Sequence, residues 1–130
     1  MTARALRLLP GRYAVCRLPP GAPLPAWVFV EHAAFWSVSR TAEELSVVCD
    51  EDALPPSVTR AETGWRALQL EGPIPFHETG VLAELTAPLA QAGIPIFALS
   101  THDTDIVMVK DRDLARALEA LRPGHWIEES

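Results

Sequence analysis

The 130-residue sequence has few cysteines, and it lacks a long apolar run. Its two cysteines, Cys16 and Cys49, are isolated and lack CxxC spacing, so we expect neither a disulfide framework nor a thiolate metal site. No stretch approaches the roughly 18 apolar residues that indicate a transmembrane helix. Pro10 and Gly11 interrupt the N-terminal segment before a signal-type apolar region. These absences predict a cytoplasmic protein without a membrane partner.

Positive charge is also scarce, because 11 Lys and Arg residues face 17 Asp and Glu residues, a net charge of −6. Proteins that bind nucleic acid usually carry a basic stripe that neutralises phosphates. The acidic balance therefore argues against a nucleic-acid partner and favours a basic or zwitterionic ligand over an anionic one. A hydrophobic content of 48% excludes a disordered chain and suffices for one ordinary domain or two small ones.

Two segments of the sequence resemble each other at a constant offset. Residues 36–50 (WSVSRTAEELSVVCD) align with residues 97–111 (FALSTHDTDIVMVKD), and the same offset of 61 positions places Leu9 on Leu70. A repeat of this length decides the architecture of a protein. The sequence therefore predicts an N-terminal unit over residues 1–63 and a related C-terminal unit over residues 64–130.

The second half of the sequence alternates strand and helix patterns. Strand patterns occupy residues 66–71, 96–100, 106–109 and 126–127, and helical spacing of leucines occupies residues 80–93 and 113–122. The order strand, helix, strand, strand, helix, strand is the split βαβ plan of ferredoxin-like domains.

The first half repeats this plan imperfectly. It has strand patterns at residues 13–18, 36–39 and 45–49, but its first helix must fit between prolines in residues 25–32 and is expected to be short or only one turn long. The predicted fold class is therefore α+β, with two tandem ferredoxin-like βαββαβ units whose antiparallel sheets carry helices on one face. The first unit is degenerate, which suggests that any ligand site lies in the second.

Two polar loops of the second half are expected to meet at one end of its sheet. They are residues 76–80, before the first helix, and residues 101–105, which join two strands as a hairpin. A helix that begins near Gly80 offers free backbone N–H groups to a carboxylate. Glu78, Asp103 and Asp105 offer negative charge to an ammonium or guanidinium group, so the loops together suit a zwitterion. In the alternative interpretation the acidic residues only cap the helix and solvate the hairpin.

Residues 72–110, GPIPFHETGVLAELTAPLAQAGIPIFALSTHDTDIVMVK, resemble the ligand-binding ACT units of the CASTOR arginine sensors and their small bacterial relatives. Those relatives carry a pattern close to F-D-E-C-G-I-V, then P-L-A, then S-T-F-N-F-D. The matching residues here are 76–82, 88–90 and 100–105, and residues 35–49 are similar to the accompanying ACT unit. The resemblance implies two tandem ACT units in a regulatory protein that senses an amino acid and is not an enzyme.

In the sensors, the ligand lies between two ACT units, and the resemblance implies a similar set of contacts here. The implied ligand-binding residues are Glu78, Thr79, Gly80, Val81, Thr101, His102 and Asp105, with Pro95 and Ile96 contributed by the facing unit. Residues 78–81 would surround the α-amino and α-carboxylate groups, and Asp105 would pair with a charged end. Because only one unit is well formed, two chains would have to combine, and we expect a homodimer with two equivalent sites.

Among the departures of this sequence from the sensor pattern, four bear on the implied ligand contacts. Thr79 replaces a cysteine, His102 a phenylalanine, Asp103 an asparagine and Pro95 a serine. Pro95 removes a backbone donor and a hydroxyl from the facing strand. The substitutions leave the identity of the amino acid open, while the added carboxylate of Asp103 favours a cationic or polar one.

Enzymatic motifs are absent from the sequence. There is no Asn for an acylphosphatase-type site, no GxxxxGK phosphate loop, and no metal-ligand spacing among the four histidines. We therefore expect no catalytic residues, no metal and no cofactor.

The aromatic residues leave a second function open. Trp27 and Phe29 beside Phe35 and Trp36 are core residues or an exposed apolar patch that recruits another protein. The alternative to an amino-acid sensor is therefore a protein–protein interaction module with a vestigial ligand pocket.

Overall fold

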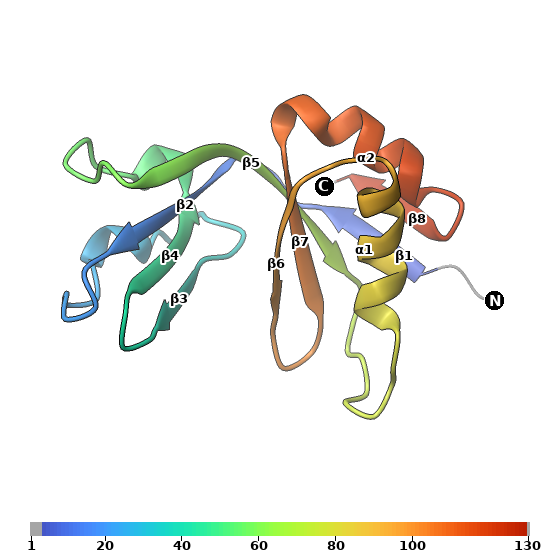
Figure 1. The fold of residues 1–130 in the computed structure, drawn as a ribbon, viewed down its shortest axis with the longest axis horizontal. Helices are drawn as coiled ribbons and strands as arrows, with labels where there is room; N and C mark the ends of the chain where they lie inside the picture. The colour runs from blue at the N-terminus through green and yellow to red at the C-terminus, as the bar shows by residue number, and fades with distance from the viewer. Residues whose placement is uncertain (1–3, 130) are drawn as a thin grey trace. The chain divides into compact units, whose positions relative to one another are not determined.

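The computed structural model describes residues 4–129, which divide into two compact units (Figure 1). Residues 4–10 and 66–129 form one unit, which we call the discontinuous unit, and residues 11–65 form the inserted unit. The sequence predicted residues 1–63 as a single unit. The structure instead groups residues 4–10 with residues 66–129, because Leu6 and Leu8 pack in the hydrophobic core that residues 66–129 form.

The discontinuous unit contains five strands and two α-helices. Its elements are β1 (Arg4–Leu8), the second part of β5 (Ala61–Leu70), α1 (Val81–Gln91), β6 (Ile96–Ser100), β7 (Asp105–Lys110), the 3-10 turn η3 (Asp111–Asp113), α2 (Leu114–Leu121) and β8 (His125–Glu129). The strand order is β6-β7-β5-β1-β8. Strand β1 pairs antiparallel with β5 and parallel with β8, so the sheet is mixed. The prediction of an antiparallel sheet is therefore wrong, since β1 enters between β5 and β8.

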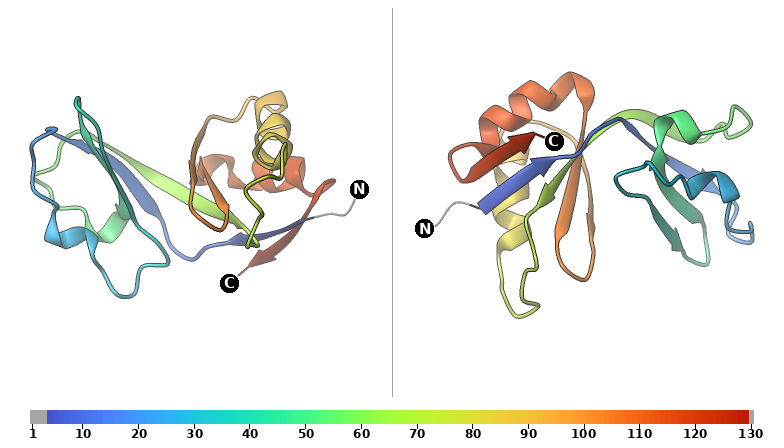
Figure 2. Two further views of the ribbon diagram at one scale, coloured as in Figure 1. Left: turned by 90° about the horizontal axis from the view of Figure 1, so that it is seen from below. Right: turned by 180° about the vertical axis from the view of Figure 1, so that it is seen from behind.

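The core of the discontinuous unit lies between this sheet and the two helices. Leu6 is paired with Leu70 and Leu8 with Leu68 across β1 and β5, so their side chains share one face of the sheet. The remaining buried members of the cluster include Val107, Val109, Leu85, Leu89, Leu118 and Leu121. Figures 1 and 2 show α1 and α2 together on one side of these strands. Each such buried side chain stabilises the fold by about 1.5–3 kcal/mol.

The inserted unit is a small antiparallel sheet. Its elements are β2 (Tyr13–Leu18), the 3-10 turn η1 (Ala26–Val28), β3 (Ser37–Arg40), β4 (Leu45–Asp50), the 3-10 turn η2 (Glu51–Ala53) and the first part of β5, in the order β3-β4-β2-β5. In residues 25–32, where the sequence predicted a short or one-turn helix, the structure has the three-residue 3-10 turn η1. Within residues 11–65 the full βαββαβ plan is not formed, and a second ACT unit there remains a prediction.

None of the helices within residues 4–129 has the length and apolar character needed to cross a membrane.

Candidate functional site

The two polar loops line a single hollow of about 300 Å³ in the discontinuous unit. We call it the α1 hollow. Its lining residues are Ile74, Pro75, Phe76, Glu78, Gly80, Val81, Leu82, Ser100, Thr101, His102, Asp103, Thr104 and Asp105. They come from the loop before α1, the first turn of α1, and the β6–β7 hairpin. The expected convergence of the two loops is therefore present, while their role in binding remains a prediction.

Three of the predicted ligand-binding residues do not line the α1 hollow. Thr79 lies in the loop between two lining residues but is not one of them. Pro95 and Ile96 lie at the start of β6, whereas the hollow is at the end of that strand, beside Ser100. At about 3.3 Å per residue, these two ends are roughly 13–16 Å apart. One copy of the discontinuous unit thus brings six of the nine predicted residues together.

The start of α1 faces this hollow with free backbone donors. Gly80 adopts φ 79°, a left-handed conformation that favours glycine, and because glycine has no side chain it cannot cap the helix. The first N–H group to bond within the helix is that of Glu84, which donates to the carbonyl of Gly80 at 2.9 Å. The preceding N–H groups, on residues 81–83, have no partner within the helix. Such groups, together with the helix dipole, form an environment suited to a carboxylate.

The β6–β7 hairpin is tied to the end of β5 by Thr104. This side chain is buried, and its Oγ1 donates to the carbonyl oxygen of Leu70 at 2.5 Å. The backbone N–H of Thr101 donates to the carbonyl of Thr104 at 2.8 Å, and the N–H of Ile74 donates to the carbonyl of Asp103 at 2.7 Å. The first of these bonds holds the hairpin to β5, the second closes the hairpin loop, and the third joins it to the segment that leads into α1, so both walls of the hollow are positioned together.

Gly72 is required for this close approach of the two walls. A Cβ atom on Gly72 would lie 2.6 Å from the carbonyl oxygen of Asp103, a distance that real Cβ contacts do not reach. Any larger residue at position 72 would therefore push the hairpin loop away from the end of β5.

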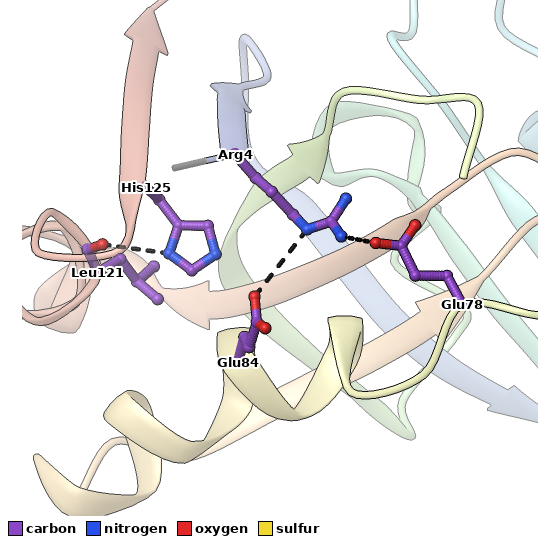
Figure 3. A network of polar contacts seen from close by, with 5 residues as sticks. All are labelled: Arg4, Glu78, Glu84, Leu121 and His125. Carbon is purple, nitrogen blue, oxygen red and sulfur yellow. Dashed lines mark hydrogen bonds and ion pairs between the residues drawn. The ribbon is translucent and has the colours of Figure 1, made fainter. Parts of the chain in front are cut away.

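The acidic residues of the hollow differ in how they are engaged. Asp105 accepts a hydrogen bond from Ser100 Oγ at 2.5 Å, and within residues 4–129 it has no cationic partner. Asp103 Oδ1 lies 2.8 Å from Nδ1 of the exposed His102. Glu78 pairs with the guanidinium of Arg4, whose Nε also lies 4.0 Å from Oε2 of Glu84 (Figure 3). Asp105 is thus the lining carboxylate whose charge is left for an external cation.

Arg4, which pairs with the lining residue Glu78, is a residue near the hollow that the sequence reasoning missed. It lies in β1, a strand that the repeat did not reveal, and 74 positions separate it from Glu78. The available signal was the alternation of Leu6 and Leu8 with Arg7, which is typical of a half-buried strand.

Apolar side chains form the rest of the wall. Phe76 is 78% exposed, and its ring packs edge-on against the ring of His102 with centroids 4.9 Å apart. Val81 is buried, and Leu82 is partly exposed on the next position of α1. The hollow therefore combines an apolar surface with a helix N-terminus and an unpaired carboxylate.

The other candidate groups do not form a site. In the part of the chain that the structure describes, no three His, Cys, Asp or Glu side chains are grouped to hold a metal ion. Cys16 and Cys49 lie buried on adjacent strands of the inserted unit. Their mutual hydrogen bond lowers the pKa of Cys16, while it raises the pKa of Cys49 together with burial.

Sequence comparisons connect the chain to regulatory proteins. A sequence model of the ACT domain matches residues 60–123, and a model of an N-terminal domain matches residues 11–57. The chain is 31% identical over 118 residues to the human protein CASTOR3P, covering 81% of this chain and 72% of that protein. It is 30% identical over 97 residues to the bovine cytosolic arginine sensor for mTORC1 subunit 1, covering 67% of this chain but only 30% of the sensor. The resemblance noted from the sequence is confirmed.

Solved structures agree with this fold. A protein from Agobacterium tumefaciens superposes with a TM-score of 0.90 and 35% identity, covering 100% of this chain and 96% of that chain. The regulatory subunit of aspartate kinase from Thermus thermophilus superposes with a TM-score of 0.65 and 16% identity, covering 95% of this chain and 99% of that chain. At that identity the second likeness shows the fold alone, an ACT-like α+β arrangement.

Proposed function

The chain belongs to the ACT-domain family, and we propose that it is a regulatory, non-enzymatic protein that binds a free amino acid in the α1 hollow. The observation that carries this proposal is that one cavity is lined both by hydrogen-bond donors for a carboxylate and by a carboxylate for a cation. The first-turn N–H groups of α1 suit an α-carboxylate, and the Asp105 carboxylate suits an ammonium group. The bovine relative is a cytosolic arginine sensor, which supports both an amino-acid ligand and a cytoplasmic location for this chain.

The proposed binding mode assigns a role to each wall. The N–H groups of Val81 and Leu82 donate hydrogen bonds to the α-carboxylate. Gly80, in its left-handed conformation, turns the backbone into the first turn of α1 beside that carboxylate. The hairpin residues Thr101 and His102 close the opposite side, and Asp105 holds the cation. Glu78 and Thr79 complete the loop that leads into α1.

We place the remaining two residues in a second copy of the chain. Within one copy, Pro95 and Ile96 lie at the far end of β6 from the hollow, so they reach a ligand only from another unit. Pro95 is exposed and thus accessible to a partner. A homodimer with an isologous interface supplies this contact twice by symmetry.

Calorimetric titration of the purified protein with each of the twenty amino acids tests the proposal. We expect at least one to bind with a dissociation constant below 1 mM, which corresponds to about 4 kcal/mol. If none binds at millimolar concentration, the sensor function is refuted.

A second candidate function is supported by an exposed aromatic pair in the inserted unit. The rings of Phe29 and Trp36 meet edge-to-face with centroids 4.7 Å apart, and both side chains are more than 40% exposed. Exposed aromatic side chains of this kind are enriched at protein interfaces. In this alternative the chain is a protein–protein interaction module with a vestigial pocket, and a Phe29→Ser variant would lose its partner while retaining its fold.

A further inference from the structure

The Arg4 guanidinium forms an ion pair with Glu78, the carboxylate that the resemblance to the sensors assigns to ligand binding (Figure 3). We propose that Arg4 is a specificity-determining residue: it supplies the cation for Glu78 from within the chain, so the hollow selects amino acids with uncharged, apolar side chains and rejects basic ones. This inference rests on the proposed function, because it concerns the ligand class of the same hollow.

Arg4 is held in place by its strand. Its position in β1 is paired with His125 in β8, and its backbone N–H donates to the carbonyl of Gly124 at 3.4 Å. His125 is buried, and its Nδ1 lies 3.2 Å from the carbonyl oxygen of Leu121, which anchors β8 to the end of α2. The guanidinium therefore projects from a fixed backbone toward the start of α1, as Figure 3 shows.

The ion pair of Arg4 is only partly open to solvent. The side chain of Arg4 is 29% exposed and that of Glu78 is 36% exposed, so the pair lies at the surface and water partly screens it. The same guanidinium lies 4.0 Å from Glu84 in the first turn of α1. One internal cation thus serves both carboxylates near the helix start, and a ligand cation would have to displace it or approach it at repulsive distance.

The charges that remain in the hollow match a single ammonium group. Asp103 Oδ1 lies 2.8 Å from Nδ1 of His102, and the Asp103 side chain is 66% exposed, whereas Asp105 has no cationic partner within residues 4–129. The α-ammonium of an amino acid satisfies Asp105, and the exposed Asp103 offers a guanidinium or a second ammonium only a solvent-screened pair that contributes little. A basic side chain would then lose part of its hydration without a buried partner, which weakens its binding.

The rest of the lining suits an apolar side chain. Ile74, Phe76 and Leu82 border the hollow, and the largest of them, Phe76, is mostly exposed. A ligand side chain that covers Phe76 removes apolar surface from water, which favours aliphatic and aromatic amino acids. The sequence alone had favoured a cationic or polar ligand, because it did not reveal Arg4.

The test compares leucine and phenylalanine with arginine and lysine by calorimetry, on the full chain. For the unmodified protein we expect an uncharged amino acid to bind at least tenfold more tightly than arginine. In Arg4→Gln, Glu78 loses its internal cation, and the ratio of the dissociation constants of arginine and the uncharged amino acid should fall about two- to fivefold. Arg4→Lys retains the cation and should retain the preference, and the double variant Arg4→Gln/Glu78→Gln should lose the gain for arginine.

Arg7→Gln is the matched control, because Arg7 is an exposed arginine of the same strand that does not line the hollow. It should leave the ratio unchanged. The inference is overturned if the unmodified protein binds arginine as tightly as leucine and phenylalanine. It is also overturned if Arg4→Gln binds amino acids but its ratio of dissociation constants for arginine and the uncharged amino acids equals that of the unmodified protein. If neither the unmodified protein nor any variant binds an amino acid, the proposed function fails and this inference fails with it.

Discussion

The Thr104 hydroxyl gives the sharpest test of how the hollow is held together. Thr104→Val preserves the shape of a side chain that is 6% exposed and removes the hydrogen bond to the Leu70 carbonyl at 2.5 Å. Loss of a buried hydrogen bond that leaves its partner without a donor costs about 1–3 kcal/mol. We therefore expect the free energy of unfolding to fall by this amount, which lowers the melting temperature by roughly 4–12 °C for a chain of this size.

Urea denaturation followed by tryptophan fluorescence measures this change, and its m-value should stay constant because the surface exposed on unfolding is unchanged. The same variant should weaken amino-acid binding, since the hairpin that carries Asp105 loses its tether to β5. Thr59→Val provides the control, because Thr59 is exposed in the inserted unit. A Thr104→Val variant with full stability and full affinity would refute the role of this hydrogen bond.

Three further predictions concern the loops and the assembly. Gly72→Ala should displace the hairpin loop, because its Cβ would lie 2.6 Å from the Asp103 carbonyl oxygen. A lower affinity for the amino acid and changed amide chemical shifts in residues 101–104 would reveal the displacement, and unchanged shifts would contradict it. Asp105→Asn should weaken binding by about 2–5 kcal/mol with little change in melting temperature, whereas normal affinity would show that the hairpin acid is only structural. Dilution below the dimer dissociation constant, followed by sedimentation and calorimetry, should abolish binding, and a monomer that still binds would disprove the shared site.

Local patterns allowed much of the fold to be predicted. The strands expected at residues 13–18 and 96–100 are confirmed with the same bounds, because both are short apolar runs bounded by polar or proline residues. The helix expected at residues 80–93 is observed as Val81–Gln91, after Gly80 in the left-handed conformation. In these segments the periodicity of the side chains matches the burial that the fold imposes.

Long-range pairing limited the rest. Strand β1 carries only five residues, and its membership in the sheet depends on partners in β5 and β8 that lie 60 or more positions away. Because β1 was missed, the parallel pairing with β8 and the ion pair of Arg4 with Glu78 were missed with it. The two loops of the hollow were predictable, since the order of strands and helices brings them to one end of the sheet, but their internal charge balance was not.

The central claim, that an amino acid binds in the α1 hollow, is tested most directly by an amide NMR titration of the full chain with each of the twenty amino acids. We predict saturable shifts concentrated at Val81, Leu82 and residues 101–105, where the free helix N–H groups and the hairpin border the hollow. Shifts confined to other parts of the chain, or no shifts at millimolar concentration of any amino acid, would contradict it.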